Sequence, residues 1–269
     1  MLNNKLPGCL ALLACIALIA QPAAADEADE LAKKLANPVA ALISVPIQAN
    51  YDENIGADED GSVWKVNVQP VIPISISEDW NVISRTIVPL ITQSDIPSGG
   101  EGESGIGDTV QSFFFSPKAP TANGWIWGAG PVLLLDTATD DALGAEQWGI
   151  GPTAVVLKQE GPWTYGALVN HIESVSGNDD RDDVSATFLQ PFLTYITSTK
   201  TTLSLNTEST YDWEHEHWTV PINFNVNQML KIGDQLLQVG GGLRYWAESP
   251  DFAADDWGLR LQLTLLFPK

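Results

Sequence analysis

The sequence is poor in the residues that build disulfides, metal centres and many catalytic sites. Its 269 residues include two cysteines and three histidines. Both cysteines, Cys9 and Cys15, lie in an apolar leader, so the remaining chain has neither a disulfide nor a thiolate nucleophile. Basic residues are scarce too, because 13 lysines and arginines stand against 34 acidic residues. This balance excludes nucleic acid as a partner, since phosphates require a basic surface.

Long hydrophobic runs are also absent, because no segment after the leader reaches the ~18 apolar residues of a transmembrane helix. The leader has Lys5, an apolar run at residues 10–20 and small residues at 23–25. This layout predicts a signal peptide over residues 1–25 and export of the mature chain. Residues 12–15 also resemble a lipoprotein cleavage box. The apolar run continues after Cys15, however, which favours cleavage near Ala25 over lipidation.

The mature chain changes from one short helical segment to a long region of period-two alternation. Residues 29–37 predict an amphipathic helix that ends before Pro38, within an N-terminal segment of residues 26–38. From residue 39 to 269, polar and apolar residues alternate as they do in strands. Twelve candidate strands result, at residues 41–51, 62–73, 80–91, 106–116, 125–136, 146–157, 163–174, 184–196, 201–212, 218–229, 235–246 and 257–267.

The number and spacing of these strands favour a transmembrane β-barrel. Twelve is even, each candidate is about ten residues long, and mostly compact turns alternate with longer loops. We therefore predict an all-β fold, namely an up-and-down outer-membrane barrel of twelve antiparallel strands behind a short N-terminal helix. A final strand that closes on Phe267 resembles the signal read by the barrel-assembly machinery, although Pro268 and Lys269 follow it.

Acidic residues and tryptophans support the same topology. Of the 34 acidic residues, 25 lie in or beside the longer loops, which we assign to the cell exterior. All ten tryptophans lie near strand ends, where indole prefers the membrane–water interface. We expect an outer girdle of Trp64, Trp148, Trp213, Trp218, Trp246 and Trp257, and an inner girdle of Trp80, Trp125, Trp127 and Trp163. Core anchors of a soluble protein would not need to segregate in this way.

Four segments resemble a known family of bacterial proteins. They are residues 37–46 (NPVAALISVP), 112–117 (SFFFSP), 131–140 (PVLLLDTATD) and 149–171 (GIGPTAVVLKQEGPWTYGALVNH). The family is that of the "MetA-pathway of phenol degradation", whose members are often labelled "neuromedin U" or "transporter". The resemblance implies an outer-membrane β-barrel linked to the uptake of small organic compounds. It implies no catalytic residues.

Four basic residues inside the predicted strands are the candidate solute-binding site: Lys65, Arg85, Arg244 and Arg260. The alternation puts Lys65 and Arg260 on the polar side, and a charge facing lipid would cost about 2–4 kcal/mol at mid-membrane. Because the last strand closes on the first, the four cations should share one arc of the lumen. The alternative is a structural role, in which they pair with lumen carboxylates such as Glu208 or with the N-terminal helix.

Two other constellations are weaker. His215 and His217, with Asp212, could form a metal site in an outer loop, although a solvated acidic loop is the interpretation we favour. The acidic loops could also hold Ca²⁺ or Mg²⁺ that bridges to lipopolysaccharide phosphates. A hydrolase would need a nucleophile beside a base, and His171 with Ser174 or Ser176 lacks any specific signature.

These observations predict a channel or transporter, not an enzyme, that uses no cofactor and carries small organic solutes, aromatic or anionic ones among them. Its expected partners are outer-membrane lipid, lipopolysaccharide, the barrel-assembly machinery and the solute. Two alternatives remain open. One is a structural or adhesion protein that acts through its acidic loops, and the other is a membrane-embedded hydrolase.

Overall fold

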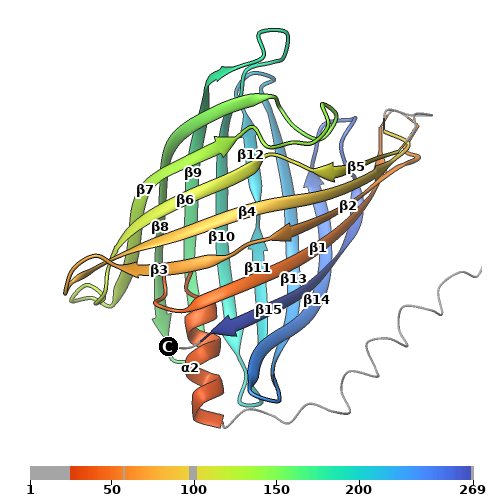
Figure 1. Cartoon of the computed structure of the whole chain (residues 1–269). Coiled ribbons are helices and arrows are strands. Elements are labelled where there is room, and N and C mark those ends of the chain that lie inside the picture. The colour runs from red at the N-terminus through yellow and green to blue at the C-terminus, as the bar shows by residue number, and fades with distance from the viewer. Residues whose placement is uncertain (1–24, 57, 97–101, 268–269) are drawn as a thin grey trace, which may run out of the picture.

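A single antiparallel sheet closes on itself in the computed structural model, which describes residues 25–56, 58–96 and 102–267. Its first strand, β1 (Ile43–Ile55), pairs with its last, β15 (Asp256–Phe267), so the sheet forms a barrel (Figure 1). The predicted signal peptide and Cys15 lie outside the described residues, except for Ala25, where helix α2 (Ala25–Leu35) begins. No helix in the described ranges is long and apolar enough to cross a membrane.

The prediction of twelve antiparallel strands is confirmed. The other strand segments in the described residues are β2 (Gly61–Val68), β3 (Val71–Ser75), β4 (Trp80–Ser94), β5 (Glu103–Ile106), β6 (Thr109–Pro117), β7 (Trp125–Leu135), β8 (Gln147–Glu160), β9 (Trp163–Gly177), β10 (Ser185–Ile196), β11 (Thr201–Thr207), β12 (Ser209–Asp212), β13 (His217–Ile232) and β14 (Gln235–Glu248). Fifteen segments make twelve barrel strands because three strands are interrupted.

The three interruptions lie between β2 and β3, between β5 and β6, and between β11 and β12. In each case both segments pair with the same neighbouring strand, so the barrel strand continues across the break. The first break contains Pro70, which has no N–H for the sheet ladder. The last break leaves out Glu208, whose N–H donates to the carbonyl oxygen of Pro221 at 3.3 Å. Glu208 therefore lies at an irregular point of the wall.

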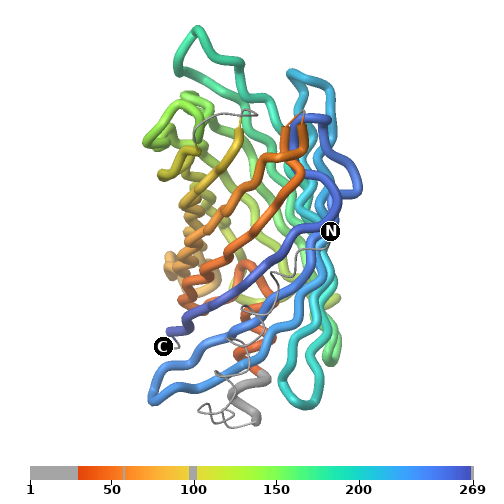
Figure 2. Tube along the Cα trace, turned by 90° about the vertical axis from the view of Figure 1, so that its right-hand side faces the viewer, coloured from red at the N-terminus to blue at the C-terminus, as the bar shows by residue number. Residues whose placement is uncertain are grey.

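Long and short connections lie at opposite ends of the barrel (Figure 2). The short turns include Gly161 and Gly233, whose φ angles of 58° and 60° suit glycine because it lacks a Cβ. At the other end the long loops contact one another, as the Gly56 N–H donates to the carbonyl oxygen of Phe252 at 3.1 Å. This arrangement agrees with the predicted alternation of turns and loops.

We expect the long loops to be extracellular. Epitope tags inserted near Gly56, Gly177 and Asp251 should then bind antibody on intact cells, because they lie among the acidic loops. A tag at Gly233, in a short turn, is the matched control and should be reached only after the outer membrane is permeabilised. The opposite labelling pattern would reverse the orientation.

The outward-facing residues form an apolar surface with aromatic ends. Nine of the ten tryptophans are exposed on the outside of the barrel or in its loops. Trp246 is the exception, so its assignment to the outer girdle was wrong. Strand alternation places it on the same face as Arg244, and its indole nitrogen donates to Asp52 Oδ1 inside the barrel at 3.0 Å.

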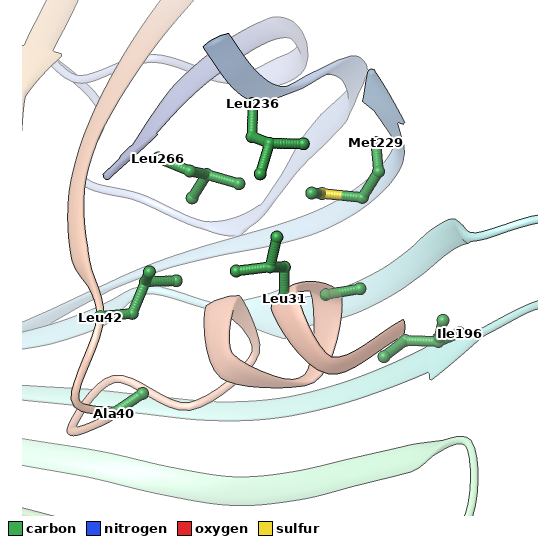
Figure 3. Close-up of a cluster of buried hydrophobic side chains, with 8 residues drawn as sticks. Leu31, Ala40, Leu42, Ile196, Met229, Leu236 and Leu266 are labelled. Atoms are coloured by element: carbon green, nitrogen blue, oxygen red, sulfur yellow. The ribbon is translucent and has the colours of Figure 1, made fainter. Parts of the chain in front are cut away.

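Helix α2 enters the barrel at the end with the short turns, which we call the inner mouth (Figures 1 and 2). Leu31 and Ala32 are 3% and 1% exposed and pack into an apolar cluster contributed by the wall and the linker. The rest of this cluster is Ala40, Leu42, Ile196, Met229, Leu236 and Leu266 (Figure 3). In addition, the Gln159 side chain donates to the carbonyl oxygen of Lys33 at 2.8 Å. Apolar packing therefore holds the helix in the inner mouth.

The lumen wall carries both apolar and polar residues. A second apolar cluster covers one side and contains Val39, Ile83, Phe114, Val155, Leu157 and Leu168. Val39 comes from the linker after α2, so the linker also packs inside the barrel. Buried polar residues lie on β1 and β11 to β15, and also beside the cluster, as at Ser112 and Thr153. The candidate site therefore has both polar and apolar surroundings.

Candidate functional site

The candidate cations lie on one arc of the lumen wall. In the order of the sheet, β14, β15, β1, β2 and β4 are consecutive, and four of these strands carry one cation each. The register explains why the side chains share a face, because Asn50 of β1 lies opposite both Lys65 and Arg260. Directly opposed residues in an antiparallel sheet point to the same side. The closure of the barrel thus brings together residues almost 200 positions apart.

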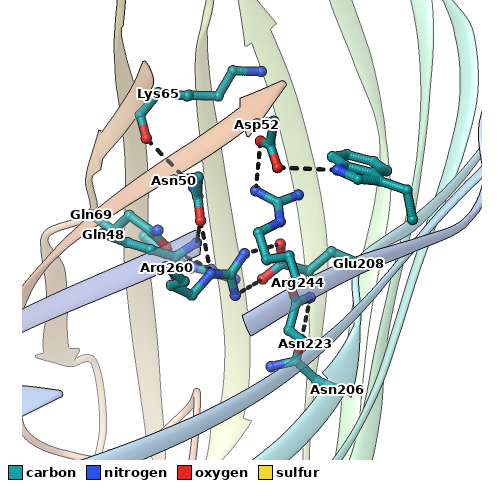
Figure 4. Close-up of polar contacts among 12 residues, drawn as sticks. Gln48, Asn50, Asp52, Lys65, Gln69, Asn206, Glu208, Asn223, Arg244 and Arg260 are labelled. Carbon is teal, nitrogen blue, oxygen red and sulfur yellow. Dashed lines mark hydrogen bonds and ion pairs between the residues drawn. The ribbon is translucent and has the colours of Figure 1, made fainter. Parts of the chain in front are cut away.

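Arg260 forms a bidentate ion pair with Glu208 (Figure 4). Its two terminal nitrogens donate to Glu208 Oε1 and Oε2 at 2.9 and 2.7 Å, while its Nε donates to Asn50 Oδ1 at 2.8 Å. The Arg260 residue is 2% exposed. A charge this deeply buried requires a partner, and two parallel hydrogen bonds to a carboxylate provide a strong one. The pairing with Glu208 that the structural alternative expected is therefore present.

Arg244 forms the second ion pair, with Asp52. Its Nη1 lies 3.2 Å from Asp52 Oδ2, and both residues are less than one-tenth exposed. The guanidinium also lies over the ring of Trp246, 4.7 Å from its centroid. Because Trp246 also hydrogen-bonds Asp52, the three residues all contact one another.

This pair predicts a stability effect. Replacing Asp52 with Asn leaves the buried Arg244 charge without its partner and should cost about 3–5 kcal/mol. The double variant D52N/R244M removes both charges and should recover most of the loss. Urea unfolding of the barrel in lipid vesicles, followed by the gel mobility of folded and unfolded forms, measures both values. Equal stabilities of D52N and wild type would mean that the ion pair has no structural role.

Lys65 and Arg85 are not neutralised in the same way. Arg85 donates to the neutral side chain of Gln69 at 2.9 Å, and Lys65 is exposed to the lumen. Across the described part of the chain, neither cation forms a salt bridge. The four cations of the arc face two acids, Asp52 and Glu208, so the arc has an excess of two positive charges. That local excess opposes the net charge of −21 on the whole chain.

A cavity of about 350 Å³ lies between the arc and helix α2. Arg85, Arg260 and Glu208 line its polar side, while Phe188 and Phe192 of β10 provide aromatic surface. Residues 32 and 34–38 of α2 and the linker close it toward the inner mouth. The cavity is therefore amphipathic and has the size of a small-molecule site.

The buried polar residues of the wall include a ladder of three asparagines. Asn223, Asn225 and Asn227 are 0%, 3% and 5% exposed. Gly242 and Gly240 of β14 lie opposite the last two, and a Cβ on Gly240 would come within 2.0 Å of Asn227 Oδ1. The two glycines were not predicted from the sequence. Glycines two residues apart in a strand indicate a site where side chains of the neighbouring strand lie directly against the backbone.

The outer-loop histidine forms ion-pair contacts. His215 Nδ1 lies 3.1 Å from Asp212 Oδ2, and its Nε2 lies 3.4 Å from Asp182 Oδ2. The His217 ring is 5.9 Å from the His215 ring. Among the residues that the structure describes, no group of three or more His, Cys, Asp or Glu side chains could hold a metal ion.

These contacts predict a pH dependence. The hydrogen bond and charge of Asp212 raise the pKa of His215 above its ordinary 6.5. The contact should be fully present below pH 6.5 and lost as pH rises through the raised pKa. NMR titration of the His215 ring should show this pKa, and Asp212→Asn should lower it. A His215 pKa of 6.5 or less in the wild type would contradict the contact.

The serines considered as partners for His171 do not fill that role. In the described residues, the two imidazole nitrogens lie 2.9 Å from Thr187 Oγ1 and 2.8 Å from Glu173 Oε1. Neither Ser174 nor Ser176 contacts the ring. Strand alternation turns Ser174 to the opposite face of β9 from His171, so the structure does not bring this pair together.

Comparison with known proteins shows a likeness in structure only. No family model and no curated protein matches this sequence. The COG4313 outer membrane channel from Pseudomonas putida F1 superposes with a TM-score of 0.64 at 16% identity, over 84% of this chain and 96% of that one. The fold is that of an outer-membrane β-barrel. Together with the apolar outer surface, it places the chain in the outer membrane.

Two more distant structures share the barrel architecture. The outer membrane phospholipase of Salmonella typhi has a TM-score of 0.48 at 10% identity, over 88% of this chain and 97% of that one. The β-domain of the Bordetella autotransporter BrkA has a TM-score of 0.46 at 10% identity, over 84% and 100%. Neither likeness bears on the function of the present barrel.

Proposed function

We propose that this barrel is a channel for small organic solutes and that it prefers carboxylates. The observation that carries the proposal is the excess of two positive charges on the lumen arc, where Lys65 and Arg85 have no acidic partner in the described residues. A solute carboxylate would compensate these charges. The structural likeness to a protein described as an outer membrane channel also supports passage.

The acidic outer loops act on anions only near the pore entrance. Their charges act across about 8 Å at physiological ionic strength, because salt screens them. The arc lies deeper, where the wall and α2 narrow the lumen, and charge at a constriction sets the selectivity of a narrow pore. The loops therefore slow the approach of anions, while the arc selects among the solutes that enter.

The shape of the cavity suggests which carboxylates fit. Phe188 and Phe192 offer apolar surface on the side facing the arc, so a ring or short alkyl chain can pack there while its carboxylate meets a cation. Solutes of this kind, aromatic acids included, should bind better than cations of equal size. A volume of about 350 Å³ limits them to small molecules.

Planar-bilayer recording of the purified full-length protein tests this function. Under a KCl gradient the reversal potential should have the sign of an anion-preferring pore, and benzoate should reduce the chloride current more than benzylammonium does. A barrel that does not conduct, with or without residues 26–36, would favour a structural or adhesion role.

We also propose that residues 1–25 direct export and that the barrel-assembly machinery recognises the last strand. Strand β15 supports the second point, because it ends at Phe267 and pairs on both sides, with β14 and with β1. Outer-membrane lipid and lipopolysaccharide are the proposed surroundings of the exposed tryptophans and the acidic loops.

A further inference from the structure

Glu208 is the one acid among the described residues that lines the cavity. It lies in the break between β11 and β12, outside the regular ladder of either segment. Its side chain is 21% exposed, whereas that of its partner Arg260 is 2% exposed. The carboxylate is thus the accessible member of the pair.

The charges around Glu208 are unbalanced. Besides Arg260, which holds both carboxylate oxygens, Arg85 and Arg244 act on the same group electrostatically. Arg244 has Asp52 as its own partner, but Arg85 contacts the neutral Gln69. A second carboxylate in the cavity would therefore find a guanidinium whose charge is not compensated.

Arg260 has a second hydrogen-bond partner besides Glu208. Its Nε donates to Asn50 Oδ1 at 2.8 Å, and Asn50 is itself only 2% exposed. The guanidinium is therefore fixed from behind by β1, and its two terminal nitrogens face Glu208 (Figure 4). This geometry makes Arg260 a preformed receptor for a carboxylate, and Glu208 its present occupant.

We propose that Glu208 stands in for the carboxylate of the solute, and that small carboxylates bind in the cavity by exchanging with it on Arg260. The inference rests on the proposed function and names the binding step. Exchange replaces one bidentate pair with another, so the buried guanidinium keeps a partner. The displaced Glu208 then turns toward Arg85. The apolar part of the solute lies against Phe188 and Phe192, which line the same cavity.

The exchange defines the class of ligand. It requires a carboxylate, because an amide or alcohol of the same shape cannot replace the charge of Glu208. It also requires a body small enough for about 350 Å³, with a ring or a short chain. Benzoate is a suitable probe, benzamide is its neutral counterpart, and acetate lacks the apolar part.

Calorimetric titration of the purified full-length barrel tests the exchange. In Glu208→Gln the competing charge is gone, so benzoate should bind at least tenfold more tightly than in the wild type, while benzamide should bind in neither. Arg260→Gln should abolish benzoate binding in both backgrounds. Arg181→Gln, which removes a cation from an outer loop, is the matched control and should keep the wild-type affinity.

A second variant keeps the test decisive if Glu208→Gln folds poorly. Glu208→Ala leaves space beside Arg260, so acetate should raise the unfolding temperature of this variant and not that of the wild type. Benzoate binding to Glu208→Gln that is no tighter than to the wild type, or absence of the acetate effect, would overturn the exchange. Conductance is measured separately. If the barrel shows the exchange but carries no current, the proposed channel function is rejected and the proposed binding site stands.

Discussion

Deletion of residues 26–36 should raise the single-channel conductance severalfold. These residues include most of α2, which packs through Leu31 and Ala32 into the inner mouth and closes the cavity on that side. Without the helix, ions would pass from the cavity directly to the short-turn end. Planar-bilayer recordings of wild type and deletion variant at the same salt concentration measure the change.

Point variants separate the loss of the whole helix from the loss of its apolar packing in the inner mouth. Leu31→Asp places a charge in the apolar cluster and should release the helix, so its conductance should approach that of the deletion variant. Glu30→Gln changes an exposed position of the same helix and should conduct like the wild type. If the deletion variant conducts no better than the wild type, α2 does not obstruct the pore.

Replacing Lys65 and Arg85 together with Gln should move the reversal potential from the anion side toward cation selectivity. The two ion pairs, Arg244–Asp52 and Arg260–Glu208, would remain, so the net charge of the arc would fall from two positive charges to none. The acidic outer loops would then hold the largest net charge on the path of an ion, and they attract cations at the pore entrance. Reversal potentials under a KCl gradient give the shift directly.

A control variant with the same change in total charge shows whether the reversal potential depends on cations of the lumen arc or on any surface cation. Lys118→Gln with Arg181→Gln removes two cations that lie in a short turn and an outer loop, and should leave the reversal potential in place. An unchanged selectivity in K65Q/R85Q would remove the main support for the proposed preference for carboxylates. Arg260 is a poorer choice for this test, because its loss would leave Glu208 without its ion-pair partner.

Much of the barrel could be predicted because its rules are local. Period-two alternation marks each strand, and glycine marks turns such as those at Gly161 and Gly233. The three breaks were missed, since a residue such as Glu208 has no distinctive neighbours in the sequence. Trp246 was assigned to the wrong side because nearness to a strand end was used in place of alternation from Arg244.

The lumen was harder to predict than the outer surface. Lipid requires an apolar residue at every second position of every strand, so the outer face repeats one simple pattern. The inner face has no such requirement. Ile83 and Phe114 pack into an apolar cluster, while Asn223 and Asn225 build a polar wall. Whether apolar or polar side chains lie near Arg85 depends on the register of strands that are distant in the sequence.

The sequence by itself determined the number of strands, the apolar outer surface, the concentration of acids in the longer loops and the presence of an amphipathic helix. Each follows from residue type and spacing within one segment. Only the tertiary structure decided that Arg260 pairs with Glu208 and contacts Asn50, and that α2 lies inside the inner mouth. Those contacts form when β15 closes on β1, because closure brings charges from opposite ends of the chain into a space where they require partners.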